Sequence, residues 1–319
     1  MNVITPHDPF EVARRIHGEG SSVPARGKRA FVALTRTNRG RIGLALLMVF
    51  LIMAVFGPAL APQDPNAASS FSTSPEQNLA DPSSEHLLGT DEQGRDVLSE
   101  VLYAARISLS VGVAAALIST ILGALVGIIA GYFGGWVDRV LMAIDDWVLV
   151  IPFIPTAIVI ASLLGRRADN WPLGRESVLV LVIGALGWAG TSRIVRSQVL
   201  TLKERDYVQR ARVLGASDRT IMSRHILPGV LPLVLANAVL YVSVAVLAET
   251  TLAFLGLGDP LNFSWGQMLN SAYESGAMTQ AKWAYFIPPG LCVTLLAMAF
   301  SLVGYAVEEI VNPTRRERA

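Results

Sequence analysis

Four polar or aromatic side chains lie in or beside long uncharged runs, where a hydrogen-bonding group stands out. Glu249 directly follows the uncharged run 226–248 and is expected near the external membrane face, where its carboxylate either contacts a solute or only marks the interface. Asn237 and Ser243 lie inside that run, where bonding to a neighbouring helix is the favoured interpretation and lining of a solute pathway the second. Trp265 lies downstream, where it closes such a pathway, meets another protein or anchors the chain at an interface. These side chains offer recognition of a solute, without bond cleavage.

Sequence signatures of catalysis and of cofactor binding are missing from the chain. None of the three lysines, Lys28, Lys203 and Lys282, completes the G-x-x-x-x-G-K-[ST] loop that binds nucleotide phosphates. The histidines form neither an H-E-x-x-H pair nor a Cys/His metal cluster, and no G-x-S-x-G marks a nucleophile. We therefore predict that the chain is not an enzyme and holds no cofactor or metal. Energy must come from another subunit or from an ion gradient.

The composition places these residues in a membrane protein. Apolar residues make up 52% of the 319 residues and charged residues only 16%, and the mean hydropathy is +0.47; a soluble domain carries roughly 25% charged residues. The net charge of +1 gives no case for nucleic acid as a partner. A single cysteine, Cys292, excludes an internal disulfide framework. Much of the surface must therefore face lipid.

Six runs lack Asp, Glu, Lys and Arg and are candidates for helices that cross the membrane. A helix needs about 20 mostly apolar residues to span a bilayer, and these runs are apolar on every face, unlike the helices of a soluble bundle. The fourth run is short, but Arg193 and Arg196 can extend their charged ends to the interface. We therefore predict an all-α polytopic membrane protein with six transmembrane helices. The runs are 42–63, 107–137, 147–165, 177–192, 226–248 and 283–307.

The basic residues predict the orientation, because cytoplasmic loops carry an excess of lysine and arginine. Residues 1–41 hold eight of the 26 basic residues, the loop 193–225 holds eight more, and the tail after residue 311 adds three. Residues 64–106 instead hold eight acids and only two arginines. Both termini and the 193–225 loop are therefore predicted to be cytoplasmic.

Two charged clusters flank the predicted spans. Asp145 and Asp146 begin the third span beside Arg139, and a structural cluster at the interface is the favoured interpretation. The second cluster precedes the second span and is expected to frame an amphipathic helix on the outer surface, with no catalytic role. Its members are Asp91, Arg95, Asp96 and Arg106.

Small residues and prolines shape two of the predicted spans. Small residues at intervals of four let two helices approach closely, so their recurrence in the second span predicts an intrachain packing seam. Pro152 and Pro155 remove backbone donors from the third span, and we expect a bend there that either lines a cavity or is a packing kink. The small residues are Gly112, Ala116, Gly123, Gly127 and Gly131.

The cytoplasmic loop before the fifth span has the pattern of a helix, a turn and a second helix. Tyr207, Ala211 and Leu214 fall at i, i+4 and i+7 and form one apolar face. Gly215 stands where a left-handed cap would end this helix, and Ser217 is placed to cap the next one. We therefore predict a compact helix–turn–helix at the membrane face.

Three interpretations of this helix–turn–helix differ in what they explain. A plain surface loop accounts for its charge but not for its amphipathic helix. DNA binding is disfavoured, because both ends of the segment run directly into membrane spans. Docking to a cytoplasmic partner accounts for both features, since an amphipathic helix offers a face to a groove and its attachment to two spans passes on the partner's movement.

The same loop resembles the EAA loop of bacterial ABC importer permeases, whose pattern is Glu-Ala-Ala, three residues, Gly, nine residues, Ile, one residue and Leu-Pro. Three positions depart from it, with Gln209 in place of Glu, Arg210 in place of Ala and His225 in place of Ile. The ending RHILP at 224–228 resembles the dipeptide and oligopeptide subfamily. The positions that match the pattern are Ala211, Gly215, Leu227 and Pro228.

Four further segments, in chain order, resemble the second permease of dipeptide, oligopeptide and nickel importers. The first is similar to the extra N-terminal span of that subunit, and the second to the segment HLLGTDEQGRDVLSEVLYAARISL before its next helix. GYFGGWVDRVLM and ETTLAFLGLGDPLNFSWGQML continue the resemblance. The segments are 38–62, 86–109, 131–142 and 249–269, so the resemblance covers most of the chain from about residue 37.

The resemblance implies a type I ABC importer permease fold and a permease subunit that moves di- or oligopeptides across the bacterial cytoplasmic membrane. The implied partners are a homologous second permease, two ABC ATPases that bind ATP and magnesium, and an extracytoplasmic binding protein. Closure of the ATPases would move a coupling helix and drive alternating access. The coupling residues implied are Arg205, Asp206, Tyr207, Gln209, Arg210, Ala211, Gly215, Ala216, Ser217, Leu227 and Pro228.

Other functions stay open at this point. An importer of nickel or another small solute shares the architecture. A secondary transporter driven by an ion gradient would show inverted repeats and ionisable residues at midmembrane, and neither is visible. A membrane-embedded enzyme or a structural subunit lacks a catalytic constellation here.

The expected organisation follows from the spans and the resemblance together. It comprises a cytoplasmic segment 1–37, a first transmembrane helix 38–62, an external loop with an amphipathic helix 63–106, a core permease domain 107–311 with five spans and the coupling loop 202–228, and a cytoplasmic tail 312–319.

Overall fold

The computed structural model of the protein describes residues 34–35, 37–65, 67, 78–168, 174–260 and 262–311. Within these ranges the chain is built of helices, and the only pairing of extended segments is an isolated bridge between Thr90 and Asp96. The predicted all-α class is confirmed for this part of the chain. Most of the predicted N-terminal segment and the whole tail 312–319 lie outside the described residues.

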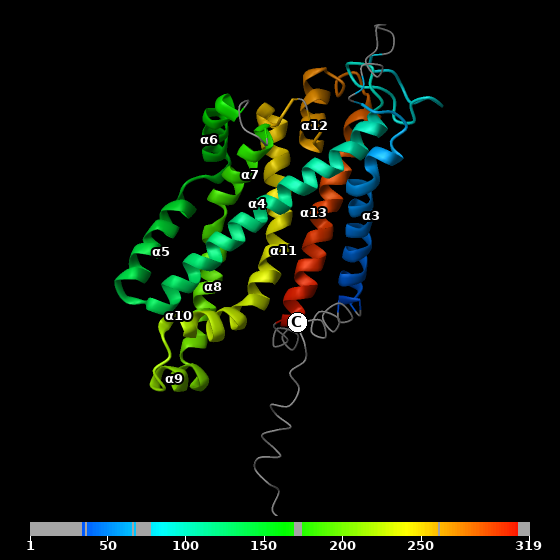
Figure 1. Ribbon diagram of the computed structural model, residues 1–319. Coiled ribbons are helices and arrows are strands. Elements are labelled where there is room, and N and C mark those ends of the chain that lie inside the picture. The colour runs from blue at the N-terminus through cyan, green and yellow to red at the C-terminus, as the bar shows by residue number, and fades with distance from the viewer. Residues whose placement is uncertain are drawn as a thin grey trace, which may run out of the picture.

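The helices of the described chain form one bundle (Figure 1). They are α3 (Asn38–Leu60), α4 (Val97–Phe133), α5 (Gly135–Val150), α6 (Phe153–Ala168), α7 (Gly174–Leu186), α8 (Trp188–Lys203), α9 (Asp206–Val213), α10 (Asp218–Ile221), η3 (Met222–Ile226), α11 (Leu227–Leu252), η4 (Ala253–Leu257), α12 (Trp265–Glu274) and α13 (Trp283–Val311). Figure 1 shows α4 crossing the bundle obliquely. The start of α3 and the end of α13 lie at the same end of the molecule as α9 and α10, opposite α6 and α12.

Five segments of the described chain are long and apolar enough to cross a membrane. A sixth candidate is the pair α5 and α6, which passes the same test only as two helices bent by 89°. The chain therefore has five candidate spans, or six if the bent pair is one span. The five are Asn38–Leu60, Val97–Phe133, Gly174–Lys203, Asp218–Leu257 and Trp283–Ile310.

The bend between α5 and α6 lies at the predicted prolines. Ile151, which ends α5, has φ −69° and ψ 126°, the extended conformation that a residue before proline prefers. Pro152 follows it, and Pro155 lies in the first turn of α6, where its missing N–H removes no helical hydrogen bond. The predicted bend is confirmed.

The second span, α4, begins before the uncharged run that predicts it. Asp96 caps its first turn by accepting hydrogen bonds from the Ser99 N–H at 2.8 Å and the Ser99 hydroxyl at 2.7 Å. The amphipathic helix expected before this span is continuous with it, because the Asp96 cap starts one helix that already contains Arg106. Its 37 residues correspond to roughly 55 Å at 1.5 Å per residue, so α4 must tilt across a hydrocarbon core of about 30 Å or extend beyond it.

The small residues of α4 pack closely against two other helices. An ideal Cβ atom at Gly127 would lie 2.5 Å from the carbonyl oxygen of Ser192 in α8. At Gly112 the side chain of Val246 in α11 already occupies the space that a Cβ would need. The predicted intrachain packing seam is confirmed, because these backbones approach too closely for any larger residue.

Two hydrophobic cores occupy different parts of the bundle. The larger core joins α3, α4, α7, α11, α12 and α13 and buries Trp265, Ile183 and Leu296 completely. The second core joins the C-terminal ends of α4 and α8 to α9, α10 and the start of α11. Large side chains on α3 and α5, such as Phe56 and Trp147, are instead exposed, as expected of helix faces that meet lipid.

Candidate coupling site and translocation pathway

The loop between the fourth and fifth predicted spans folds into α9 and α10 (Figure 1). Asp206 occupies the first turn of α9, where the helix dipole favours a negative charge. The Gln209 side chain donates a hydrogen bond to the Lys203 carbonyl at 2.8 Å, which fixes the corner between α8 and α9. Lys203 donates in turn to the carbonyl of Gly131 at 3.1 Å. The corner is thereby held to the end of α4.

A left-handed turn at Gly215 ends α9. Gly215 has φ +80°, a conformation that a residue without a Cβ adopts at low cost. Its N–H donates to the Arg212 carbonyl at 3.0 Å, and the Ala216 N–H donates to the Ala211 carbonyl at 3.0 Å. These two bonds form the Schellman motif, which closes the C-terminal ends of many helices. The left-handed cap predicted at Gly215 is confirmed.

The next helix, α10, is capped as predicted and is anchored to α4. The Thr220 N–H donates to the Ser217 hydroxyl oxygen at 3.3 Å, and Asp218 lies in the first turn. The hydroxyl of Tyr132, near the end of α4, donates to Asp218 Oδ1 at 2.7 Å. The Arg212 guanidinium lies 5.9 Å from the centre of the same tyrosine ring. Tyr132 therefore contacts both parts of the loop.

The residue that anchors α9 by its side chain is Val208, which the helical pattern does not select. It is fully buried in the second core with Val199 and Ile221. The pattern places Tyr207 and Leu214 on the apolar face, and no described part of the chain covers these two side chains. One buried valine in a helix of eight residues creates no periodicity, so only the tertiary contacts identify it.

The tip of the loop presents an apolar pair that no described residue covers. Val213 and Leu214 are each 86% exposed, and Arg210 and Arg212 are exposed beside them. The Schellman turn and the second core fix the direction in which this pair points. A rigid apolar pair among positive charges suits a groove on another protein.

Ion pairs bind α8, which leads into α9, to the neighbouring helix α5. Arg196 Nη2 lies 2.6 Å from Asp138 Oδ2. Arg193 Nε lies 2.6 Å from Asp145 Oδ2, and its guanidinium also pairs with Asp146. These ion pairs therefore link α8 to α5.

These ion pairs correct one expectation from the sequence. Arg139 does not join the aspartates of its own helix, and its Nε instead donates to the carbonyl of Gly135 at 3.3 Å. The reason is distance, since Arg139 stands almost two helical turns, about 10 Å, from Asp146. Arg193 and Arg196 also pair with the acids of α5, which the tertiary structure brings alongside, and their extension to the membrane interface stays a prediction.

Asn237 and Ser243 join α11 to its neighbours by hydrogen bonds. Asn237 Nδ2 donates to Thr191 Oγ1 of α8 at 2.7 Å. The hydroxyl of Ser301 in α13 donates to Ser243 Oγ at 3.1 Å. The favoured interpretation, bonding between helices, is confirmed, and lining of a pathway stays a prediction.

Glu249 and Trp265 are both buried inside the bundle. Glu249 is 1% exposed, and its carboxylate accepts a hydrogen bond from the Thr250 hydroxyl at 3.4 Å. The backbone N–H of Trp265 donates to Ser108 Oγ at 3.2 Å, and its indole N–H donates to the Val101 carbonyl at 3.1 Å. The interpretation of Trp265 as an interfacial anchor is wrong, because α12 turns this side chain inward. A pathway role for Glu249 and Trp265 stays a prediction.

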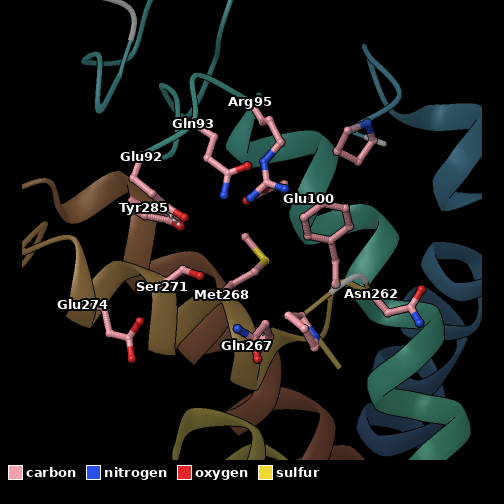
Figure 2. Close-up of a pocket in the computed structure, with 13 residues that line it drawn as sticks. Glu92, Gln93, Arg95, Glu100, Asn262, Gln267, Met268, Ser271, Glu274 and Tyr285 are labelled. Carbon is pink, nitrogen blue, oxygen red and sulfur yellow. Dashed lines mark hydrogen bonds and ion pairs between the residues drawn. The ribbon is translucent and has the colours of Figure 1, made fainter. Parts of the chain in front are cut away.

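A cavity of about 480 Å³ (Figure 2) is lined by α12, which lies at the other end of the molecule from α9 (Figure 1). It is bounded by the start of α4, by α12 and by the start of α13. Sequence reasoning missed its glutamates, because they come from separate segments and share no spacing. The charged residues that line it are Glu92, Arg95, Glu100 and Glu274.

The predicted outer-surface cluster forms a buried turn beside this cavity. Asp91 accepts hydrogen bonds from the backbone N–H groups of Gln93 at 2.8 Å and Arg95 at 2.7 Å, and the Arg95 guanidinium pairs with it at 2.6 Å. Gly94, with φ +81°, allows the tight turn. The prediction of a surface position is therefore wrong for Asp91 and Asp96, which are both buried.

Comparison with known proteins identifies the family. Residues 123–317 match the family described as the binding-protein-dependent transport system inner membrane component. The chain belongs to this family of ABC importer permeases. Residues 26–82 of the permease also match the family described as the N-terminal TM domain of oligopeptide transport permease C. The resemblance read from the coupling loop and the collinear segments is confirmed.

Relatives of the permease cover most of its length. The dipeptide transport system permease protein DppC of Bacillus subtilis is 35% identical over 288 residues, which cover 90% of this chain and 85% of that protein. The oligopeptide transport system permease protein OppC of Mycobacterium tuberculosis is 34% identical over 289 residues, 90% of this chain and 96% of that protein. The DppC protein of Alkalihalophilus pseudofirmus is 32% identical over 287 residues, 90% and 89% of the two chains.

Proposed function

We propose that this permease forms one half of the pathway of an ABC importer that carries di- or oligopeptides across the bacterial cytoplasmic membrane. Its relatives are described as dipeptide and oligopeptide transport permeases. That similarity supports peptides over nickel, which the same architecture also admits. The other half of the pathway is a homologous second permease.

Two ATPases that bind ATP and magnesium energise the transport, and an extracytoplasmic binding protein delivers the solute. The family description, a binding-protein-dependent system, supports the second partner. The absence of a nucleotide-binding loop from the sequence supports hydrolysis on separate subunits. Both termini are cytoplasmic in this proposal, together with α9, because the described chain ends lie at the same end of the bundle as the basic loop (Figure 1).

The observation that carries the proposal is the exposed, rigid tip of α9. Val213 and Leu214 project from a turn that is locked at Gly215 and backed by the second core. This tip docks on an ATPase and moves with it. The movement reaches α4 through Tyr132 and α5 through the ion pairs of α8, which switches the pathway between outward and inward access.

Reconstitution into liposomes tests the transport function. The chain alone should move no peptide, and the complete set of subunits should import a labelled dipeptide only when ATP is present. Uptake by the chain alone in an ion gradient would instead identify a secondary transporter.

A charge placed on the tip tests the docking surface. Leu214→Asp should lower ATPase copurification and ATP-dependent uptake by about tenfold or more, because the new carboxylate would be desolvated in the groove. The stability of the chain should not change, since this side chain is exposed. Leu87→Asp is the matched control, an exposed leucine at the other end of the molecule. Normal copurification of the Leu214→Asp variant would refute the assignment.

A further inference from the structure

The cavity at the start of α4 (Figure 2) carries more negative than positive charge. Three glutamates and one arginine line it among the described residues. Arg95 is already held by Asp91 at 2.6 Å and by Glu100 at 3.0 Å. Neither Glu92 nor Glu274 has an ion-pair partner among the described residues. A cation is therefore favoured in the cavity.

The carboxylates of the cavity retain hydrogen-bonding capacity. Glu92 Oε2 accepts from the Tyr285 hydroxyl at 2.7 Å, and Glu274 Oε1 accepts from Asn270 Nδ2 at 3.4 Å. A carboxylate has about four acceptor sites, so each keeps room for another donor. Glu100 is 1% exposed, and its Oε1 forms the 3.0 Å ion pair with Arg95 Nε but meets no hydrogen-bond geometry within the described chain. A buried oxygen that lacks a hydrogen bond favours the binding of a further donor.

The rest of the wall matches the other groups of a short peptide. Met268 and Phe263 supply apolar surface, and Gln93 and Gln267 supply amide donors and acceptors. The Arg95 guanidinium lies 4.8 Å from the centre of the Phe263 ring, which steadies that part of the wall. The volume of about 480 Å³ lies within the range of about 300–1,000 Å³ found for small-molecule sites.

We propose that this cavity binds the free amino terminus of a short peptide, with the carboxylates of Glu92 and Glu274 as its acceptors. An ammonium group donates three hydrogen bonds and fits them better than a metal ion, since the described residues hold no cluster of three or more metal-ligating side chains. The inference deepens the proposed function and rests on it for the identity of the solute. The cavity lies far from α9, so the peptide binds there on the external side, before it enters the pathway.

A binding experiment without ATP tests the inference. The full-length chain, with any subunits that copurify but without the binding protein, is placed in nanodiscs and titrated with L-alanyl-L-alanine and with its N-acetylated form. Acetylation should weaken binding by about tenfold or more, because it removes the charge-assisted hydrogen bonds of the ammonium group. Glu274→Gln should weaken binding of the free dipeptide to a similar extent, and Glu92→Gln/Glu274→Gln should abolish it.

The variants have a matched control and are expected to fold. Glu274 is exposed, and Asn270 keeps its 2.9 Å bond to the Phe254 carbonyl in its absence. Glu85→Gln makes the same charge change in an exposed residue outside the cavity and should bind the dipeptide like the unmodified chain. The thermal midpoint of each variant confirms that it is folded.

Two results would overturn the inference. One is equal affinity for the free and the acetylated dipeptide, and the other is unchanged affinity in Glu92→Gln/Glu274→Gln. Failure of the proposed function gives a different result. A chain that binds the dipeptide through its amine, but is never found to import it in the reconstituted system, would contradict peptide transport and leave the binding site intact. If the glutamate variants weaken only the association of the purified binding protein, the cavity recognises that protein and the inference fails.

Discussion

Gly215 shows how a single residue fixes the direction of the loop that holds α9 and α10, the proposed docking loop. Its backbone has φ +80°, and no heavy atom lies within 4 Å of the position that a Cβ would take. Backbone strain, and not crowding, would therefore oppose a side chain there. The left-handed conformation costs an L-residue roughly 1–2 kcal/mol, and a β-branched residue tolerates it least.

Gly215→Val should uncouple the permease from its ATPases. Strain of roughly 1–2 kcal/mol would change the equilibrium constant between the native and altered forms of the turn by roughly 5- to 30-fold. ATPase copurification and ATP-dependent uptake should therefore both fall. Gly190→Val is the control, because Gly190 is an exposed glycine of α8 with open space around it and without the left-handed backbone. Unchanged copurification and uptake in Gly215→Val would contradict the coupling role.

At the scale of elements, the contact between α4 and α8 links the loop to the rest of the bundle. The glycines of α4 let the two backbones approach, and α8 then continues directly into the corner before α9. Overpacking of such a seam costs about 1–3 kcal/mol. The seam should therefore be more sensitive to added volume than any lipid-facing position.

Gly127→Leu should lower the midpoint of thermal unfolding in detergent, because its Cβ would lie 2.5 Å from the Ser192 carbonyl oxygen. Gly290→Leu adds the same side chain to α13, where no heavy atom lies within 4 Å of an ideal Cβ, and should leave the midpoint nearly unchanged. Equal midpoints for the two variants would show that α4 and α8 can move apart at the seam without loss of stability.

The ion pairs between α5 and α8 form a second link at this scale. Asp138 and Arg196 are partly exposed, so their interaction contributes at most about 1 kcal/mol to stability. In a double-mutant cycle, Asp138→Asn and Arg196→Gln should each destabilise the chain, and the double variant should be no less stable than the worse single variant. Fully additive losses in free energies of unfolding would show that the two residues act independently.

At the scale of the whole molecule, the described chain ends and the docking loop lie at one end of the bundle and the glutamate-lined cavity at the other (Figure 1). The basic residues predict that the first end faces the cytoplasm. In this proposed orientation, an ATPase and an external peptide would contact the same chain at the same time, on opposite sides of the membrane.

Cysteine labelling tests this orientation in a Cys292→Ser background. Glu85→Cys, near the cavity end, should react with a membrane-impermeant maleimide added to spheroplasts. Ser217→Cys, in the docking loop, should react only after the membrane is made permeable. Both positions are exposed, so a difference in labelling reports on the side of the membrane. Labelling of Ser217→Cys from outside would contradict docking on a cytoplasmic ATPase.

The sequence alone determined the features that depend on local chemistry. Uncharged runs identified five of the candidate spans, because the cost of burying charge in lipid acts on each segment separately, whereas the run 147–165 lies across the bend between α5 and α6. Regular small residues indicated the seam in α4. Gly215 indicated the end of α9, because few residues other than glycine adopt a left-handed cap. The docking loop could therefore be located, and the family resemblance established, without coordinates.

Only the tertiary structure decided which distant residues meet. It buried Val208 beneath the docking loop and paired Arg193 with the acids of α5 in place of Arg139. It also gathered glutamates from separate segments around one cavity. These contacts depend on the packing of whole helices and leave no repeating pattern along the chain, since hydrophobic periodicity reports the face of a helix and not the neighbour it meets.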